Sequence, residues 1–379
     1  MKLLISIAAL ILCVSCHSHK VMPNSVLIES EAIHMNKAKN IIFLIGDGMG
    51  IGQITAGTYA NNNKTALERF EIVGLHKPYS GDNLVTDSAA AATSFSSGVK
   101  TFNGAIGMNM DTIPVQTLLE EAEEKGLKTG LVATSTIVHA TPASYIAHNV
   151  TRQDYEGIAL DFLDTEVDYF VGGGKKFFDR REDEKNLITE LESKGYHMGN
   201  YLEEFNTFTS SLTSDINKIG YLTADESPIP ASQGRDYLEA ASLFGINFLD
   251  KQSDNGFFLM IEGSQIDWGG HANDKDYIIS EFLEYNRVIG KVLDWAEKDG
   301  ETLVVVTADH ETGGFTIQPG STRDSLVTAF TTPKHSGDFI PVFASGPGSE
   351  LFSGLYENTE IYFKMREVFG WNELARNAN

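Results

Sequence analysis

Asp87 and Ser88 precede the consecutive alanines Ala89–Ala92, in a stretch that reads VTDSAAAAT. Alanine is the best helix former, so we expect Ser88 at or beside a helix N-terminus. The unpaired backbone N–H groups of such a terminus favour an anion such as a phosphate. The stretch therefore offers a hydroxyl nucleophile beside an anion site, although a serine that only caps a helix gives the same local pattern.

Residue types that bind metal ions gather in five further short motifs. The candidate ligands are Asp47 in GDGMG, His139 and Thr141 in HATP, Glu262, Asp267 and His271 in EGSQIDWGGH, Asp309 and His310 in ADHETGG, and His335 in HSG. Nitrogen and carboxylate ligands without thiolates suit Zn²⁺, whereas a site richer in oxygen suits Mg²⁺. A lone histidine or acid is usually a hydrogen-bonded or capping residue. That interpretation explains poorly why three potential ligands follow one buried strand in a glycine-rich loop.

Buried strands must position these motifs, because most of the motifs directly follow an apolar run. The expected strands are residues 41–45, 129–134, 169–171, 257–261, 303–307 and 339–344, and the expected helices are 115–125, 236–249 and 277–297. This alternation predicts an α/β fold, with a single large domain and a mostly parallel central sheet flanked by helices. Ligands of such sheets bind beyond the carboxyl ends of the strands, so we expect the motifs to converge on one edge.

Two other stretches carry weaker patterns. Residues 83–85 are strand-like and lead into Ser88, and residues 180–194 form a charge-rich helical pattern. The second stretch lies within residues 179–234, whose polar, proline-containing loops indicate a surface elaboration on the sheet and no separate domain.

The first 16 residues have the pattern of a secretory signal. An apolar run over residues 3–14 follows Lys2 and is too short to span a bilayer. Both cysteines of the chain, Cys13 and Cys16, lie here, so the mature domain is expected to have no internal disulfide. Cys16 resembles the lipidated cysteine of a bacterial lipoprotein, although Cys13 stands where a leucine is usual. We expect residues 17–38 to be a linker and residues 39–379 to be the folded domain.

The chain of 379 residues is strongly acidic, with a formal net charge of −23. A nucleic-acid partner is therefore not expected, since phosphate backbones need a basic surface. The charge fits a solvated protein that holds divalent cations, whose own charge the formal count omits.

Taken together, the DSAAAAT stretch and the five ligand motifs resemble the bacterial alkaline phosphatases, from about residue 38 to the C-terminus. The resemblance implies hydrolysis of phosphate monoesters, with Ser88 forming a phosphoserine intermediate. It also implies that Arg152 binds the substrate phosphate, and a guanidinium does present a donor fork that matches two phosphate oxygens. Asp87 could hold Arg152 in position.

The resemblance further implies two Zn²⁺ and one Mg²⁺. One zinc would be held by Asp267, His271 and His335, the second by Asp47, Asp309 and His310, and the third metal, normally magnesium, by Asp47, His139, Thr141 and Glu262.

Two positions vary within the family. His139 stands where some members carry an acid, which would weaken the preference for magnesium because imidazole suits zinc better. Trp268 is a substrate-binding position where other members carry a lysine, so we expect a weaker hold on phosphate and faster product release. The short stretch between His310 and His335 indicates little or no crown insertion over the site.

The alternatives are a phosphodiesterase of the same superfamily and a non-catalytic envelope protein that binds metal or phosphate. A diesterase needs a pocket for a second ester group, and a pure binder needs no nucleophile, so Ser88 and Arg152 favour the monoesterase. A sulfatase is disfavoured because Ser88 does not lie in a C/S-x-P-x-R sequence. The resemblance suggests small phosphate monoesters as substrates, a homodimer, and an exported protein that is periplasmic or anchored by a lipid at Cys16.

Overall fold

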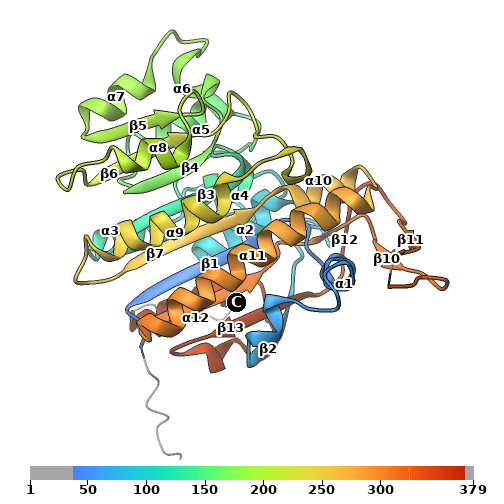
Figure 1. The fold of residues 1–379 in the computed structure, drawn as a ribbon. Coiled ribbons are helices and arrows are strands. Elements are labelled where there is room, and N and C mark those ends of the chain that lie inside the picture. Colours follow the sequence, from blue (N-terminus) through green and yellow to red (C-terminus); the bar gives the residue numbers. More distant parts are fainter. Residues whose placement is uncertain (1–36, 324, 372–379) are drawn as a thin grey trace, which may run out of the picture. The chain divides into compact units, whose positions relative to one another are not determined.

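The structure is a computed structural model that describes residues 37–323 and 325–371. Within this part of the chain, a ten-stranded sheet has the order β14–β2–β13–β8–β1–β7–β3–β4–β6–β5 (Figure 1). Its strands are β1 (Asn40–Gly46), β2 (Ile72–Lys77), β3 (Lys128–Thr136), β4 (Tyr169–Gly173), β5 (Tyr196–Asn200), β6 (Lys218–Leu222), β7 (Phe257–Gly263), β8 (Thr302–Thr307), β13 (Ile340–Ser345) and β14 (Gly354–Glu357).

The strands from β8 through β5 are all parallel to one another. β13 is antiparallel to both of its neighbours, β8 and β2, and β14 is parallel to β2. The amino-terminal end of β13 therefore lies at the edge where the parallel strands end. The prediction of a mostly parallel central sheet in an α/β domain is confirmed. Two small antiparallel ladders add β9 (Glu311–Thr312) with β12 (His335–Ser336), and β10 (Thr316–Ile317) with β11 (Thr328–Ala329).

Helices cover both faces of the sheet (Figure 1). On one face lie α1 (Ile51–Ala60), α9 (Tyr237–Asp250) and α11 (Lys275–Asp299). On the other lie α2 (Ser88–Ser97), α3 (Leu118–Glu124) and α12 (Glu360–Phe369). The shorter helices are α4 (Ala140–Ala143), α5 (Tyr155–Asp161), α6 (Lys176–Asp179), α7 (Leu187–Ser193), α8 (Phe205–Ser210) and α10 (Gln265–His271), with 3₁₀ turns η1 (Ala66–Arg69), η2 (Ala231–Gln233) and η3 (Ser349–Phe352).

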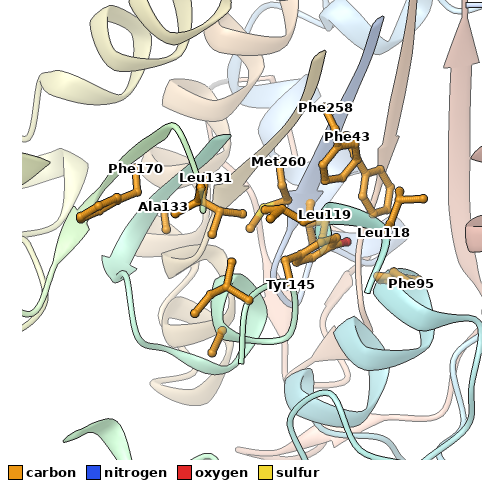
Figure 2. Packing of buried hydrophobic residues seen from close by; sticks show 14 of the residues in the cluster. Phe43, Phe95, Leu118, Leu119, Leu131, Ala133, Tyr145, Phe170, Phe258 and Met260 are labelled. Carbon is orange, nitrogen blue, oxygen red and sulfur yellow. The ribbon is translucent and has the colours of Figure 1, made fainter. Parts of the chain in front are cut away.

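Strand β1 shows why the central strands read as unbroken apolar runs. All of its residues are buried, because helices pack on both faces of the sheet. Phe43 points to the α2 face, where its ring meets Phe95 edge-on at 5.7 Å (Figure 2). The neighbouring Ile42 and Leu44 point to the α11 face. The strand is thereby fixed on both sides, which fixes the direction of the loop that carries Asp47.

Two local predictions are wrong. Residues 83–85 form no strand, because their backbone is bonded by the side chains of Asn83 and Asn103 in place of a neighbouring strand. Residues 180–194 are not one helix, since α6 ends at Asp179 and α7 begins only at Leu187, behind the cap of Asn186. Residues 179–234 contribute β5 and β6, two strands at the edge of the main sheet.

The expected signal at residues 1–16 and all but the end of the expected linker lie outside the described residues, and so does Cys16. In the described part of the chain, none of the helices has the length and apolar character needed to cross a membrane.

Candidate active site

Ser88 is the first residue of α2, as its position before the alanines predicts. The N-cap is Asp87, whose Oδ1 accepts a hydrogen bond from the backbone N–H of Ala90 at 3.0 Å. Every residue of α2 is buried, and the alanines allow this close packing. The Ser88 hydroxyl oxygen lies 3.4 Å from Asp47 Oδ2 and 3.3 Å from His310 Nε2. The candidate nucleophile is thus surrounded by candidate metal ligands.

Asp47, Asp309 and His310 form one group whose ligand atoms lie within 4.8 Å of one another. All three are completely buried. His310 Nε2 is 3.1 Å from Asp309 Oδ2 and 3.6 Å from Asp47 Oδ1. Asp47 follows β1 and the other two follow β8, so the adjacent parallel strands bring the three together.

Asp267, His271 and His335 form a second group. His271 Nε2 lies 3.3 Å from Asp267 Oδ2 and 3.2 Å from His335 Nε2, and His335 Nε2 lies 3.6 Å from Asp267 Oδ1. The other ring nitrogen of each histidine is 2.8 Å from a backbone carbonyl, that of Pro333 for His271 and that of Thr86 for His335. Because a carbonyl accepts only from an N–H, the proton of each neutral ring lies on Nδ1, and Nε2 has the lone pair that can bind a metal. His310 also belongs here by distance, since its ring stacks on that of His335 at 3.5 Å.

Asp47, His139 and Glu262 form a third group within the same 4.8 Å limit. Glu262 is the next-to-last residue of β7, and His139 precedes α4, whose Thr141 is fully buried. Ser135 donates a hydrogen bond of 3.4 Å to Glu262 Oε2.

These three groups fit metal ions. Within the described residues, several of their buried polar atoms have no hydrogen-bond partner: Asp47 Oδ1, Asp309 Oδ2, Glu262 Oε1, His139 Nδ1 and Thr141 Oγ1. Burial, reinforced by the charge of Asp309, raises the pKa of Asp47 well above its ordinary value. Burial likewise raises the pKa of Glu262 to about 7. Carboxylates crowded in this way need bound cations to stay ionised.

Arg152 lies beside the three groups. Its Nη1 donates to Asp87 Oδ2 at 3.0 Å, and its Nη2 is 3.4 Å from His139 Nε2. Burial and the charge of Arg152 together lower the pKa of His139 to about 3, so His139 is neutral and can bind a metal.

Comparisons with known proteins identify the family of the chain. The family model for alkaline phosphatase matches residues 38–329. The chain belongs to the alkaline phosphatase family. Alkaline phosphatase 3 of Bacillus subtilis is 33% identical, with 93% of each chain covered. The solved alkaline phosphatase of the Antarctic bacterium TAB5 is 43% identical, with a TM-score of 0.84 over 89% of this chain and 100% of that one. A His-to-Asp mutant of the TAB5 enzyme, solved with Mg bound in its M3 site, has a TM-score of 0.83 at 43% identity and the same coverage.

This member of the family is accordingly a metal-binding phosphate monoester hydrolase. Family membership and the likeness of the whole chain to curated alkaline phosphatases carry that statement. The structure brings all the sequence-predicted site residues to one edge of the sheet. Trp268, one turn into α10, is half-buried and sets its ring against that of His139 at 6.2 Å, edge to face.

One residue of this region escaped the sequence analysis. Thr312 is fully buried, and its hydroxyl lies 2.5 Å from Asp267 Oδ1 and 3.3 Å from His310 Nδ1. Thr312 follows His310 by two positions in the ADHETGG motif. Its closeness in sequence to the candidate ligands Asp309 and His310 was the signal that could have identified it.

Proposed function

We propose that Ser88 carries the hydrolysis of phosphate monoesters through a phosphoserine intermediate. The observation that supports this most directly is the position of the Ser88 hydroxyl, within 3.4 Å of two candidate ligands and at a helix N-terminus. Ser88 Oγ attacks phosphorus, and the bond from phosphorus to the ester oxygen breaks in line. The alcohol leaves with the serine proton. A water then attacks the phosphoserine, which restores the hydroxyl and releases inorganic phosphate.

Arg152 holds the non-bridging oxygens of the phosphoryl group in both steps. Its Nη1 is oriented by Asp87, and Nη2, which lies 3.4 Å from His139 Nε2, carries a second N–H that can donate toward the substrate. The transition state is loose and its charge is spread over oxygen atoms, so positioning supplies much of the rate.

The metal ions are proposed in three sites. Asp267, His271 and His335 would hold one Zn²⁺, Asp47, Asp309 and His310 the second, and Asp47, His139, Thr141 and Glu262 the third ion, Mg²⁺ or Zn²⁺. Such ions stabilise developing negative charge and lower the pKa of a hydroxyl or a water. The single imidazole at the third site favours zinc there more than an all-oxygen site would.

Trp268 explains an expected difference in product handling. An indole beside the site supplies no positive charge toward phosphate, whereas a lysine would. We expect a weaker hold on inorganic phosphate and its faster release. A broad range of monoesters is expected as substrates, because the motifs provide no group that would bind one alcohol leaving group in preference to another.

The export and assembly of the protein are also proposals. They comprise a signal at residues 1–16, a linker at 17–38, the domain at 39–379, a periplasmic or lipid-anchored location with Cys16 as the anchor, and a homodimer. The sequence pattern of the leader and the family resemblance support them.

The test is hydrolysis of a chromogenic phosphate monoester at alkaline pH, before and after chelation and with Zn²⁺ plus Mg²⁺ restored. We expect chelation to abolish activity and the two metals to restore it, with two zinc and one further ion bound per chain. A chromogenic diester and a sulfate ester serve as comparisons. Faster turnover of the diester would favour the phosphodiesterase, and no turnover by a folded, metal-loaded protein would favour the binding protein.

A further inference from the structure

The segment of residues 83–87, which precedes Ser88, is held by hydrogen bonds from a side chain. Residues 83–87 lie in no strand of the described chain, yet they must place Asp87 and Ser88 with precision. The side chain of Asn103 makes the hydrogen bonds to this segment that a neighbouring strand would otherwise make. Its Nδ2 donates to the carbonyl of Val85 at 3.0 Å, and its Oδ1 accepts from the N–H of Asp87 at 3.0 Å. One carboxamide thus bonds the C=O of residue i and the N–H of residue i+2, as the N–H and C=O of a single residue in a parallel neighbouring strand would.

The next residue extends this support to the phosphate-binding pair. The N–H of Gly104 donates to Asp87 Oδ1 at 3.1 Å, and the carbonyl of Gly104 accepts from the backbone N–H of Arg152 at 2.8 Å. Gly104 has φ +93°, a conformation that favours glycine. The turn formed by Asn103 and Gly104 therefore contacts both partners of the Asp87–Arg152 ion pair.

The turn is itself anchored. The N–H of Asn103 donates to Asp82 Oδ1 at 3.1 Å, and the same oxygen accepts from the hydroxyl of Ser80 at 2.9 Å. The N–H of Gly81 donates to the carbonyl of Thr101 at 2.7 Å, so the two loops are joined at Gly81 as well as at Asp82. Asn103 is thus held by bonds that do not involve the active site.

We propose that Asn103 is a positioning residue for the phosphoryl-transfer reaction, acting on phosphate through Asp87 and Arg152. The proposal rests on the proposed function, in which Arg152 binds the phosphate. The position requires an amide, because it must donate and accept at once. Aspartate keeps the acceptor for Asp87 but sets a carboxylate against the Val85 carbonyl, and leucine keeps the size but loses both bonds.

The test measures the affinity for inorganic phosphate, as a competitive inhibitor, in a double-mutant cycle of metal-loaded proteins. We expect Asn103→Leu to weaken phosphate binding by about tenfold, as two lost hydrogen bonds predict. In the background of Arg152→Ala, we expect the same substitution to change phosphate affinity by less than about twofold, since the two residues act as one unit. A residue that only stabilised the loop would give additive effects.

Asn109→Leu is the matched control. The Asn109 side chain caps a turn in the same loop region, where its oxygen accepts from the N–H groups of Asp111 and Ile113, and no bond joins it to residues 85–88 in the described chain. We expect phosphate affinity to stay unchanged in this variant. If Asn103→Leu does not fold, the isosteric Asn103→Asp takes its place in the cycle, with the same non-additivity expected.

The outcomes separate the two proposals. If Arg152→Ala leaves phosphate affinity intact, the role of Arg152 in the proposed function is wrong. If Arg152→Ala weakens phosphate binding but the Asn103 variants bind it normally, or if the two effects add, Asn103 is not a positioning residue.

Discussion

The hydroxyl of Thr312 donates to Asp267 Oδ1 over 2.5 Å and lies 3.3 Å from His310 Nδ1. One hydroxyl has one proton to donate, so once Thr312 donates to the carboxylate it accepts from the Nδ1–H of His310. That arrangement leaves His310 Nε2 unprotonated, on the side of Asp47 and Ser88. Thr312 thereby orients a ligand of each of the two proposed zinc sites.

We predict that Thr312→Val weakens zinc binding at both sites. Valine keeps the shape of threonine but removes the hydroxyl, so Asp267 and His310 lose a shared partner. Loss of an outer-sphere hydrogen bond lowers metal affinity by about 10- to 100-fold. Competition with a chromophoric chelator measures this directly, without turnover. Thr312→Ser should restore most of the affinity, and wild-type zinc affinity in Thr312→Val would contradict the prediction.

Ser88→Ala is expected to keep the fold and the metals but to lose activity by a factor of about a thousand or more, because the nucleophile is gone. Phosphate trapped on the protein in acid-quenched reactions should be found in the wild type and be absent from this variant. Ser96→Ala is the matched control, since within the described residues the Ser96 hydroxyl bonds only to the backbone of its own helix, at Thr93. Undiminished turnover by Ser88→Ala would rule out the phosphoserine mechanism.

Substitution of His139 should change which metal fills the third site. In His139→Asp the donors become carboxylate and hydroxyl oxygens, which favour Mg²⁺ over Zn²⁺. After dialysis against a mixture of both ions, we expect the bound ratio of magnesium to zinc to rise by at least roughly tenfold, since the loss of a ligand's hydrogen-bond partner alone changes metal affinity by about 10- to 100-fold. Elemental analysis gives the ratio, and an unaltered ratio would show that His139 is not a ligand.

His148 and Glu120 form a pair away from the site, with 2.9 Å between Nε2 and Oε1. The hydrogen bond to Glu120 raises the pKa of His148 above 6.5, despite burial. Burial alone would raise the pKa of Glu120, but its bonds to His148 and the Thr117 N–H lower it below 4.5. The contribution of His148 to the stability of the fold is therefore complete below pH 6.5 and is lost as the pH rises through its raised pKa. The stability from Glu120 is present above 4.5 and is lost as the pH falls through the lowered pKa.

The His148–Glu120 pair should stabilise the fold most between about pH 4.5 and pH 6.5. We expect His148→Gln to lower Tm by roughly 1–2 °C near pH 5.5 and by less near pH 9, as a partly exposed pair worth under about 1 kcal/mol predicts. Thermal unfolding of the wild type and the variant at both pH values checks this. A larger loss near pH 9 than near pH 5.5 would contradict the assigned direction.

The sequence by itself determined the central layer and most of the candidate ligands. β1, β7 and β8 are buried on both faces, so their sequences are nearly unbroken apolar runs. Asp47, Glu262 and Asp309 lie within two residues of the carboxyl ends of these strands. The position of Ser88 at a helix N-terminus could also be predicted, because the alanines that follow it favour a closely packed helix. In each case the signal lies within a few residues of the feature that it predicts.

Only the tertiary structure decided where contacts between distant segments form. His335 reaches the site because β13 runs antiparallel to β8, and strand direction is not encoded in an apolar run. The edge strands β5 and β6 are short and contain glycine, so their patterns are weak. The Asn103 side chain bonds the backbone of Asp87, and Thr312 in β9 bonds Asp267 in α10. These bonds depend on side chains meeting backbone or ligands far along the chain, which no local periodicity records.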